Sequence, residues 1–419
     1  MIAADPAASF APTLAAVHGR IAAIRPVDYA RSRNALDGAV TRLSPYISHG
    51  FVTLPEVLLG AAARHRFGVQ HKFVFELGWR EFFRHVWQHH GDRIFASLHA
   101  GPLPDDAYAP ELPADIREAR SGVPVIDAAV RTLYATGYLH NHARMWVASY
   151  VVHLRRVHWR AGADWLYAHL LDGDLASNHL SWQWVAGTGS HKPYLFNAAN
   201  VARYAAPAWH SPDSVIDTSY DALDAIAGGG PLPAVRAGDD GVEEPTLHDR
   251  PPDSWPLSAP DAAEVAGRDV WLVHPWSLSG APPDLPANTL RIGVVSAAFH
   301  RAWPWSEARW AFVGMRIAEL APRCWHAETP AIAQALRSVR SVQMQADPHV
   351  EPALHALAAC RPASRLFIDV DRPCTSFSQW WKLATRGVRE LHELPGAASL
   401  PAGPLFDRDP CHPHTETAA

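Results

Sequence analysis

DGDLASNHLSWQWVAGTG, residues 172–189, concentrates acidic, amide and indole side chains in one short stretch. Its two Asp residues, separated by one Gly, could bind a divalent cation. No third acidic ligand follows at the spacing of a calcium-binding loop, so the stretch does not predict a calcium site. The alternative is that its polar groups hydrogen-bond the edge of a heteroaromatic ring, with indoles close by. The side chains available for this are Asp172, Asp174, Asn178, Trp182 and Trp184.

A second unusual segment is ELGWREFFRH, residues 76–85, within an apolar pattern of helical period. Glu76 and Arg80 are four residues apart, so an intrahelical salt bridge is the simpler interpretation. Trp79 lies between them and could instead stack on a planar ligand.

The third segment contains Thr41, Arg42 and Ser44, just before Pro45 and an expected helix. Two hydroxyls, a guanidinium and free backbone N–H groups at a helix start suit a phosphate. A plain helix cap with one surface arginine is the simpler alternative.

The fourth segment is GYLHNHARM, residues 137–145. His140 and His142 do not predict a metal site, because alternate positions of a helix point to different faces. Asn141 and Arg144 are three residues apart and can face one pocket.

The organisation of the chain changes near residue 228. Residues 1–227 show helical periodicity, and residues 228–267 are rich in Gly, Pro and acidic residues, as in a linker. From 268 to 395, apolar β-branched runs alternate with helical patterns, which predicts a parallel α/β sheet. The runs expected to form strands include LRIGVVSAAF (residues 290–299) and RLFIDVD (residues 365–371). Residues 396–419 are expected to form a flexible tail. The predicted fold class is mainly α, with a helical domain followed by a smaller α/β domain.

The composition excludes several classes of protein. The 419 residues are 48% hydrophobic and 19% charged, and the net charge of −5 provides no strong global attraction for nucleic acid. The four Cys form no CxxC pair, and no glycine-rich nucleotide loop is present. No apolar run is long enough for a membrane span, and the first residues do not resemble a signal peptide, so we expect a cytoplasmic protein.

The four segments, in this order, resemble the FAD-binding domain of the DNA photolyase/cryptochrome family. A fifth stretch, PYLFNAANVARY (residues 193–204), is similar to the family's next motif, and the resemblance covers residues 29–204. It implies a helical fold and FAD as cofactor. The residues implied to hold the pyrophosphate are Thr41, Arg42, Leu43 and Ser44, with Tyr29 nearby; those implied to surround the flavin and ribityl groups are Arg80, Asn141, Arg144, Asp172 and Asp174. Arg144 and Asp172 are expected to pair beside the flavin ring, and Asn178 to face its N5 atom.

On the substrate side, the resemblance is to photolyases that repair cyclobutane pyrimidine dimers. It implies that Glu76 hydrogen-bonds the dimer, that Trp79 and Trp184 wall the pocket, and that Met145 lines it. Trp182 and Trp159 match the first two members of the family's electron-transfer chain; the third is not evident. The implied function is light-driven repair of such dimers in DNA, which makes the protein a carbon–carbon lyase.

Several departures keep two alternatives open. Val40 replaces a frequent hydroxyl residue of the phosphate turn, and Ala198 replaces a Pro. The family's α/β antenna domain precedes the FAD domain, whereas here a domain that weakly resembles part of it follows. No antenna chromophore or oligomeric state is indicated. The alternatives are a cryptochrome-like blue-light photosensor without repair activity and a flavoprotein of another activity.

Overall fold

The computed structural model describes residues 10–190 and 192–398, so the predicted tail lies outside it except for residues 396–398. The first part of the chain is helical: α1 (Leu14–Ala22), α2 (Pro26–Ser32), α3 (Ser44–Ser48), α4 (Leu54–Ala62), α5 (Lys72–His90), α6 (Ala114–Arg117), α7 (Pro124–Thr136), α8 (Asn141–Ser149), α9 (Trp159–His169), α10 (Leu175–Ala186), α11 (Ala198–Tyr204) and α12 (Tyr220–Ala227). Among the described residues, no helix is long and apolar enough to cross a membrane.

Local sequence signals account for the boundaries of these helices. α7 begins with Pro124, whose missing N–H is not needed in the first turn, and ends before Gly137, which adopts a left-handed conformation. Asp174 caps α10, because its carboxylate accepts the Ser177 N–H. α8 continues into one turn of π-helix, Tyr150–Leu154.

The α/β part follows: β1 (Leu247–His248), β2 (Leu257–Ser258), α13 (Ala262–Val265), β3 (Asp269–Val273), β4 (Leu290–Ser296), α14 (Ala297–Ala302), β5 (Trp305–Ser306), α15 (Glu307–Leu320), β6 (Cys324–Ala327), α16 (Thr329–Ala335), β7 (Ser341–Gln345), α17 (Pro352–His355), β8 (Ala359–Arg361), α18 (Phe377–Ala384) and α19 (Pro395–Ala398). Six strands form a sheet in the order β2-β6-β4-β3-β7-β8, and every neighbouring pair is parallel. The predicted α/β domain with a parallel sheet is therefore present. Its edge strand β2 lies in residues 228–267, which the sequence predicted to be a linker.

One predicted strand is wrong. The run RLFIDVD, residues 365–371, reads as a strand, but it forms none, and the last strand is β8. The backbone N–H groups of Leu366 and Phe367 donate to the Glu81 carboxylate of α5 instead of to a neighbouring strand. Both side chains are buried, so this apolar run packs on the helical part and not in the sheet.

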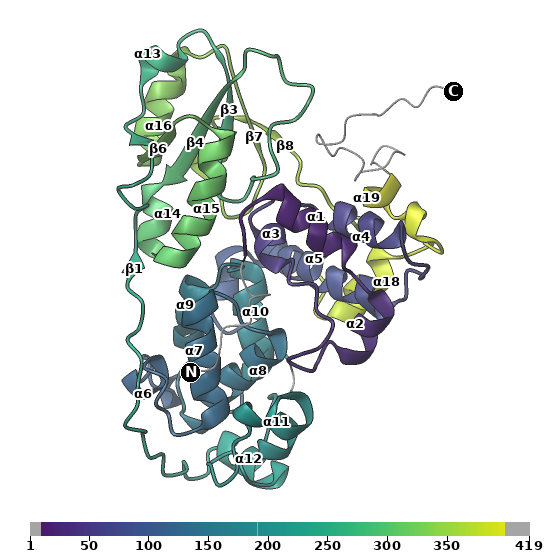
Figure 1. Cartoon of the computed structure of the whole chain (residues 1–419), viewed down its shortest axis with the longest axis vertical. Coiled ribbons are helices and arrows are strands. Elements are labelled where there is room, and N and C mark those ends of the chain that lie inside the picture. The colour runs from purple at the N-terminus through teal and green to yellow at the C-terminus, as the bar shows by residue number, and fades with distance from the viewer. Residues whose placement is uncertain (1–9, 191, 399–419) are drawn as a thin grey trace, which may run out of the picture.

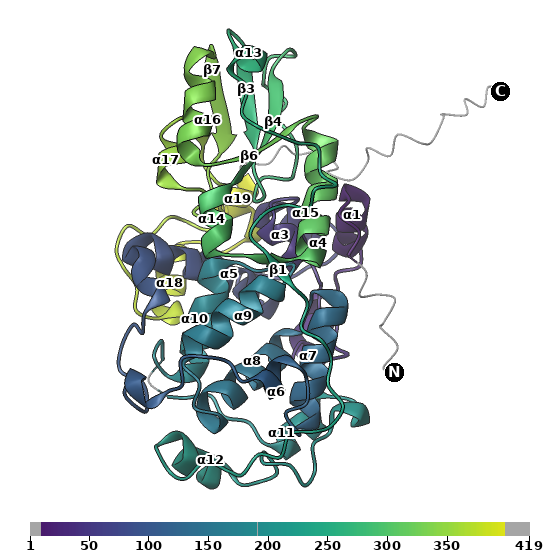
Figure 2. The same cartoon turned by 90° about the vertical axis from the view of Figure 1, so that its left-hand side faces the viewer.

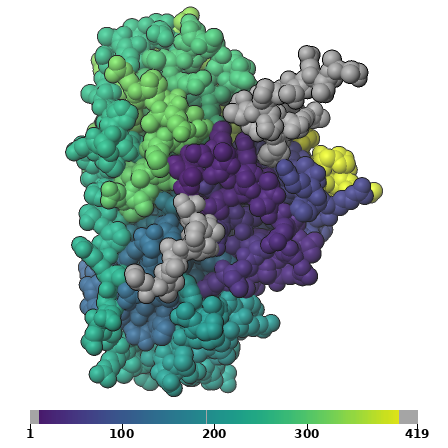
Figure 3. Space-filling model, in the orientation of Figure 1, coloured from purple at the N-terminus to yellow at the C-terminus, as the bar shows by residue number. Residues whose placement is uncertain are grey.

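The hydrophobic core is not divided between the helical part and the α/β part. One core cluster joins α1, α4 and α5 to the strands of the sheet and to α18 and α19, whereas a second is confined to residues 112–223. Figures 1 and 2 show that the sheet packs against the N-terminal helices and that α18 lies beside α5 and α19 beside α4. In Figure 3 the purple N-terminal surface is continuous with the green surface of the α/β part.

Candidate functional site

The four singled-out segments converge around α10. This helix packs against α5, α8 and α9. At its start, the Ser48 hydroxyl of α3 donates to the Asp172 carbonyl over 2.9 Å, and Arg80 Nη1 donates to the Ser48 Oγ over 3.2 Å. Ser48, at the end of α3, therefore links α3 to the helix α5 and to the DGD segment.

The turn before α3 has an unusual backbone. Arg42 has a φ of 51°, which lies in the left-handed region that non-glycine residues rarely adopt. Such strain is often found where a backbone is shaped for a ligand. The Leu43 N–H donates to Thr41 Oγ1 over 3.4 Å, and Ser44 begins the helix. Tyr29 lies edge-on to Phe73, and burial raises the pKa of its phenol above the ordinary value.

Arg144 and Asp172 form a two-point ion pair. Arg144 Nη2 donates to both carboxylate oxygens, over 3.0 and 2.8 Å, and its Nε donates to the Leu139 carbonyl over 2.7 Å. The Asp172 side chain is 3% exposed and that of Arg144 is 23% exposed. Within the described part of the chain, Arg144 donates these hydrogen bonds through Nε and Nη2, so its Nη1 can donate to a ligand.

Asp174 has two arginine partners. Arg80 and Arg84 each place Nη2 beside its Oδ2, at 3.2 and 3.3 Å. Burial raises the pKa of a carboxyl, but the two guanidiniums outweigh burial and hold the Asp174 pKa well below its ordinary value. The Glu76–Arg80 salt bridge considered from the spacing is not the arrangement found, because Glu76 pairs with Lys72 and Arg33 at 2.9 and 3.2 Å.

Asn178 and the two tryptophans of the expected electron-transfer chain lie where α9 meets α10. The Asn178 amide donates to the Ala163 carbonyl over 2.8 Å, which sets its orientation. Trp182 lies against Gly162, where a Cβ would be 2.3 Å from the indole. Trp159, at the start of α9, donates its Nε1–H to Ser97 Oγ over 3.0 Å, and both indoles are buried.

The expected substrate-side residues are less enclosed. Trp79 is half-buried, and its indole stacks on Phe377 of α18. Asn141 is exposed and donates to the Met145 sulfur over 3.8 Å, and Trp184 is 39% exposed beside Tyr194. Sequence reasoning missed Phe377, because it is remote in the chain from Trp79.

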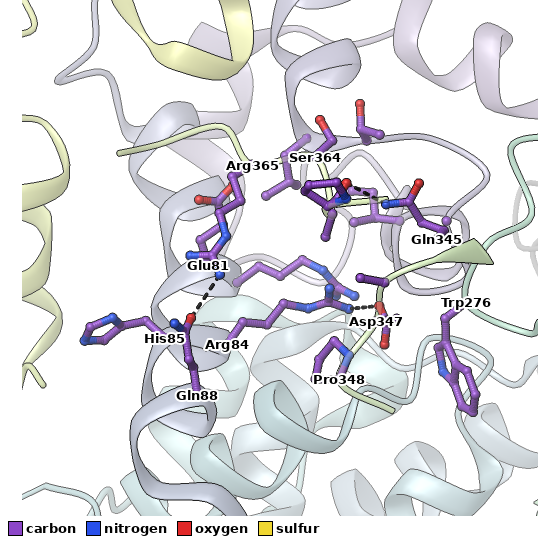
Figure 4. A pocket seen from close by; sticks show the side chains of 18 of the residues that line it. Glu81, Arg84, His85, Gln88, Trp276, Gln345, Asp347, Pro348, Ser364 and Arg365 are labelled. Carbon is purple, nitrogen blue, oxygen red and sulfur yellow. Dashed lines mark hydrogen bonds and ion pairs between the residues drawn. The ribbon is translucent and has the colours of Figure 1, made fainter. Parts of the chain in front are cut away.

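A cavity of about 480 Å³ lies between α5 and the sheet (Figure 4). Residues that follow β3, β7 and β8 line it, so it opens at the carboxyl edge of the sheet, where the strand order reverses. Arg84 crosses from α5 to pair with Asp347 over 3.1 Å, and Trp276 forms the opposite wall. Sequence reasoning missed this cavity.

The residues fit a flavin dinucleotide. The site holds a guanidinium fixed by a buried carboxylate with one nitrogen left over, a strained turn beside hydroxyl groups, and an oriented amide. Donors of this kind suit the acceptor atoms of a flavin ring and a pyrophosphate. Among the described residues, no group of three or more His, Cys, Asp or Glu side chains could hold a metal ion.

Comparisons with known proteins find similarity over part of the chain. Residues 73–209 match the family model described as the FAD binding domain of DNA photolyase. A deoxyribodipyrimidine photo-lyase of Streptomyces griseus is 37% identical over 164 residues, which cover 39% of this chain and 36% of that protein. A cryptochrome DASH of Idiomarina loihiensis is 34% identical over 169 residues, covering 39% and 38%.

The similarity covers only part of this chain and part of each relative. The chain spans about two fifths or less of the curated relatives it matches, including a Thermus thermophilus deoxyribodipyrimidine photo-lyase that is 36% identical over 41% of each chain. A solved cryptochrome of Synechocystis is similar over 52% of each chain, with 26% identity and a TM-score of 0.42. Residues 73–209 of this chain are thus similar to the FAD-binding domain of the DNA photolyase/cryptochrome family.

Proposed function

We propose that this protein repairs cyclobutane pyrimidine dimers in DNA under blue light. The observation that carries the proposal is the placement of Glu76 beside the start of α8. Arg33 pairs with Glu76 over 3.2 Å, and the next residue, Asn34, accepts a hydrogen bond from His142 Nδ1 over 2.9 Å. Residues 33 and 34 therefore link Glu76 of α5 to His142 of α8.

Each side chain has a role in this proposal. The Glu76 carboxylate accepts hydrogen bonds from the bases of the dimer, and Met145 lines the site that the dimer would occupy. Trp79 and Trp184 supply indole faces for stacking, which is worth about 1–3 kcal/mol per base. The dimer reaches them by being flipped out of the duplex, which weak stacking at a lesion favours.

The cofactor would be held by the residues around α10. Arg144, fixed by Asp172, and Asn178, fixed by Ala163, would bind the ring, while the turn at Thr41–Ser44 would bind the pyrophosphate. When bound and reduced, a flavin supplies one-electron transfer under light. Trp182 and Trp159 would carry electrons toward it during photoreduction.

The α/β part would then act as an antenna-like domain. Supporting this assignment, the sheet has the order of doubly wound sheets, which bind ligands where the strand order reverses, at the carboxyl ends of the strands. The cavity between α5 and the sheet lies at that position.

A specific observation favours the second candidate function, a blue-light photosensor without repair. Glu76 already has two cationic partners, and Phe377 covers one face of Trp79. A lesion would have to compete with the ion pairs and use the remaining face of the indole.

One experiment separates the two functions. The full chain is reduced, mixed with an oligonucleotide that contains a single cyclobutane dimer, and illuminated with blue light, with a dark sample and an undamaged strand as controls. Repair predicts loss of the dimer in the light only and tighter binding of the damaged strand. Absence of repair, together with equal binding of both strands, excludes the enzyme and supports the photosensor.

A further inference from the structure

The α/β part contacts the segment 171–175, which carries both aspartates of the flavin site. Arg309 of α15 is fully buried, and its Nη2 donates to the Gly173 carbonyl over 2.6 Å, while its Nη1 donates to the Tyr167 carbonyl over 3.1 Å. The guanidinium carbon lies 3.9 Å from the centroid of the Trp305 ring, so the indole holds it in place.

Gly173 is required for this contact. A Cβ at this position would lie 2.4 Å from Arg309 Nη1 and 2.7 Å from the Tyr167 carbonyl oxygen, which is closer than real Cβ contacts. Because position 173 is a glycine, the Arg309 side chain of the α/β part can approach the backbone between the two aspartates.

His349, which follows β7, holds the other end of the segment. Its Nε2 accepts the Leu175 N–H over 3.1 Å, and its Nδ1 lies 2.7 Å from Asp347 Oδ1. Because Nε2 is the acceptor, the proton is on Nδ1, which donates to Asp347. The ring is fully buried and stacked on Trp276, with 4.9 Å between centroids.

Leu175 is the first residue of α10, and its N–H has no partner within the helix. The N-terminus of α10 is thus capped by Asp174 from its own segment and by His349 from the α/β part. Asp347 links the two caps, because Arg84 pairs with both Asp347 and Asp174.

We propose that the α/β part completes the flavin site, with Arg309 and His349 as positioning residues that hold segment 171–175. In this position Asp172 fixes Arg144 and Asp174 fixes Arg80. The inference rests on the flavin site used in the proposed function but not on repair activity. It predicts that changes in the α/β part loosen FAD without contact between the altered side chain and the cofactor.

The Arg309 test measures FAD release from the purified full chain by the rise in flavin fluorescence on dilution. Arg309→Met keeps much of the side-chain length but removes both donors, and we expect FAD to bind at least tenfold more weakly. Arg309→Lys keeps the charge and one donor and should recover part of the loss. Arg316→Met is the matched control, because Arg316 is also buried on α15 but donates to the Leu278 carbonyl and not to the segment itself.

The His349 test uses the same measurement and does not depend on the Arg309 variants folding. His349→Phe removes the acceptor for the Leu175 N–H and should weaken FAD binding at least tenfold, whereas His349→Gln restores an acceptor and should recover part of the affinity. His85→Phe is the control, because the buried His85 also accepts a backbone N–H, that of Cys374 over 3.2 Å, outside segment 171–175.

Selective loss of FAD in Arg309→Met and His349→Phe, with recovery in the conservative variants, supports the inference. It is overturned if the controls lose as much FAD as the test variants, since the effect is then general destabilisation. Unchanged FAD release in Arg309→Met and His349→Phe also overturns it. None of these outcomes depends on repair, so a protein that repairs nothing can still support the inference.

Discussion

The indole of Trp79 stacks on the ring of Phe377, with the two centroids 4.2 Å apart and the planes inclined by 17°. The contact joins α5, near the start of the chain, to α18, near the end of the described residues. A ring has two faces, so a base that stacks on Trp79 would use the face opposite Phe377. Helix α18 would thus restrict such a base to one face of the indole.

Trp79→Ala is expected to weaken binding of a dimer-containing strand about tenfold or more while FAD stays bound. Stacking on an aromatic ring contributes about 1–3 kcal/mol, and about 1.4 kcal/mol is a factor of ten. Fluorescence anisotropy with damaged and undamaged strands measures the change. Phe75→Ala is the matched control, since Phe75 also contacts Phe377 from α5. Equal losses in the two variants would mean that the effect comes from α18 and not from substrate stacking.

Trp182→Phe is expected to slow light-driven reduction of the flavin strongly and to leave FAD bound. Phe fills most of the space beside Gly162 but is much harder to oxidise than Trp. The measurement is the decay of flavin absorbance under blue light with an external reductant. Trp165→Phe provides the control, because Trp165 is also buried on α9 but bonds Tyr134. If Trp182→Phe is reduced as fast as this control, electrons reach the flavin by another path.

Asp172→Asn is expected to lower the free energy of unfolding by about 3 kcal/mol and to reduce FAD retention. The change leaves Arg144 largely buried without its charge partner, and breaking a buried ion pair costs about 3–5 kcal/mol. Urea denaturation and the flavin released per mole of protein measure the two effects. Asp92→Asn, at an exposed position, is the control. A variant as stable as the control would show that the Arg144–Asp172 pair contributes little.

Glu81 is expected to make the protein less stable as the pH rises from about 4.5 to about 7. Burial raises the pKa of this carboxyl to about 7 in spite of the hydrogen bonds from Leu366 and Phe367. Over that range the unfolded chain ionises first and the folded chain keeps its proton, so stability falls with pH, by up to about 3 kcal/mol in total. Above the folded pKa the loss is complete and constant.

The measurement is urea denaturation at pH 5 and pH 8 of the unaltered protein and of Glu81→Gln. The variant should lose this part of the pH dependence, whereas Glu111→Gln, at an exposed position, should keep it. If the curves of Glu81→Gln and the unaltered protein change equally with pH, Glu81 is already ionised in the folded protein at pH 5.

Local patterns predicted the individual elements well and their partners poorly. The period of α5, the Pro124 start and Gly137 end of α7, and the alternation that gives the parallel sheet all depend on neighbours within a few residues. Spacing did not identify the charge partners of Glu76, one of which, Arg33, is 43 residues away in the sequence. Four-residue spacing places Arg80 within its reach, but Arg80 pairs with Asp174, and Glu76 takes Lys72 and Arg33.

The sequence by itself determined the helical character of residues 14–227, the parallel α/β part, the resemblance to the photolyase FAD-binding domain and the residue types of the candidate flavin site. Backbone propensities and short motifs carry that information. Only the tertiary structure decided that the RLFIDVD run joins the helical part, that Phe377 covers Trp79, and that Arg309 and His349 hold segment 171–175. These contacts join residues more than 100 positions apart, and they form because buried polar groups must find hydrogen-bond partners and apolar faces must be covered wherever the chain brings a complementary group.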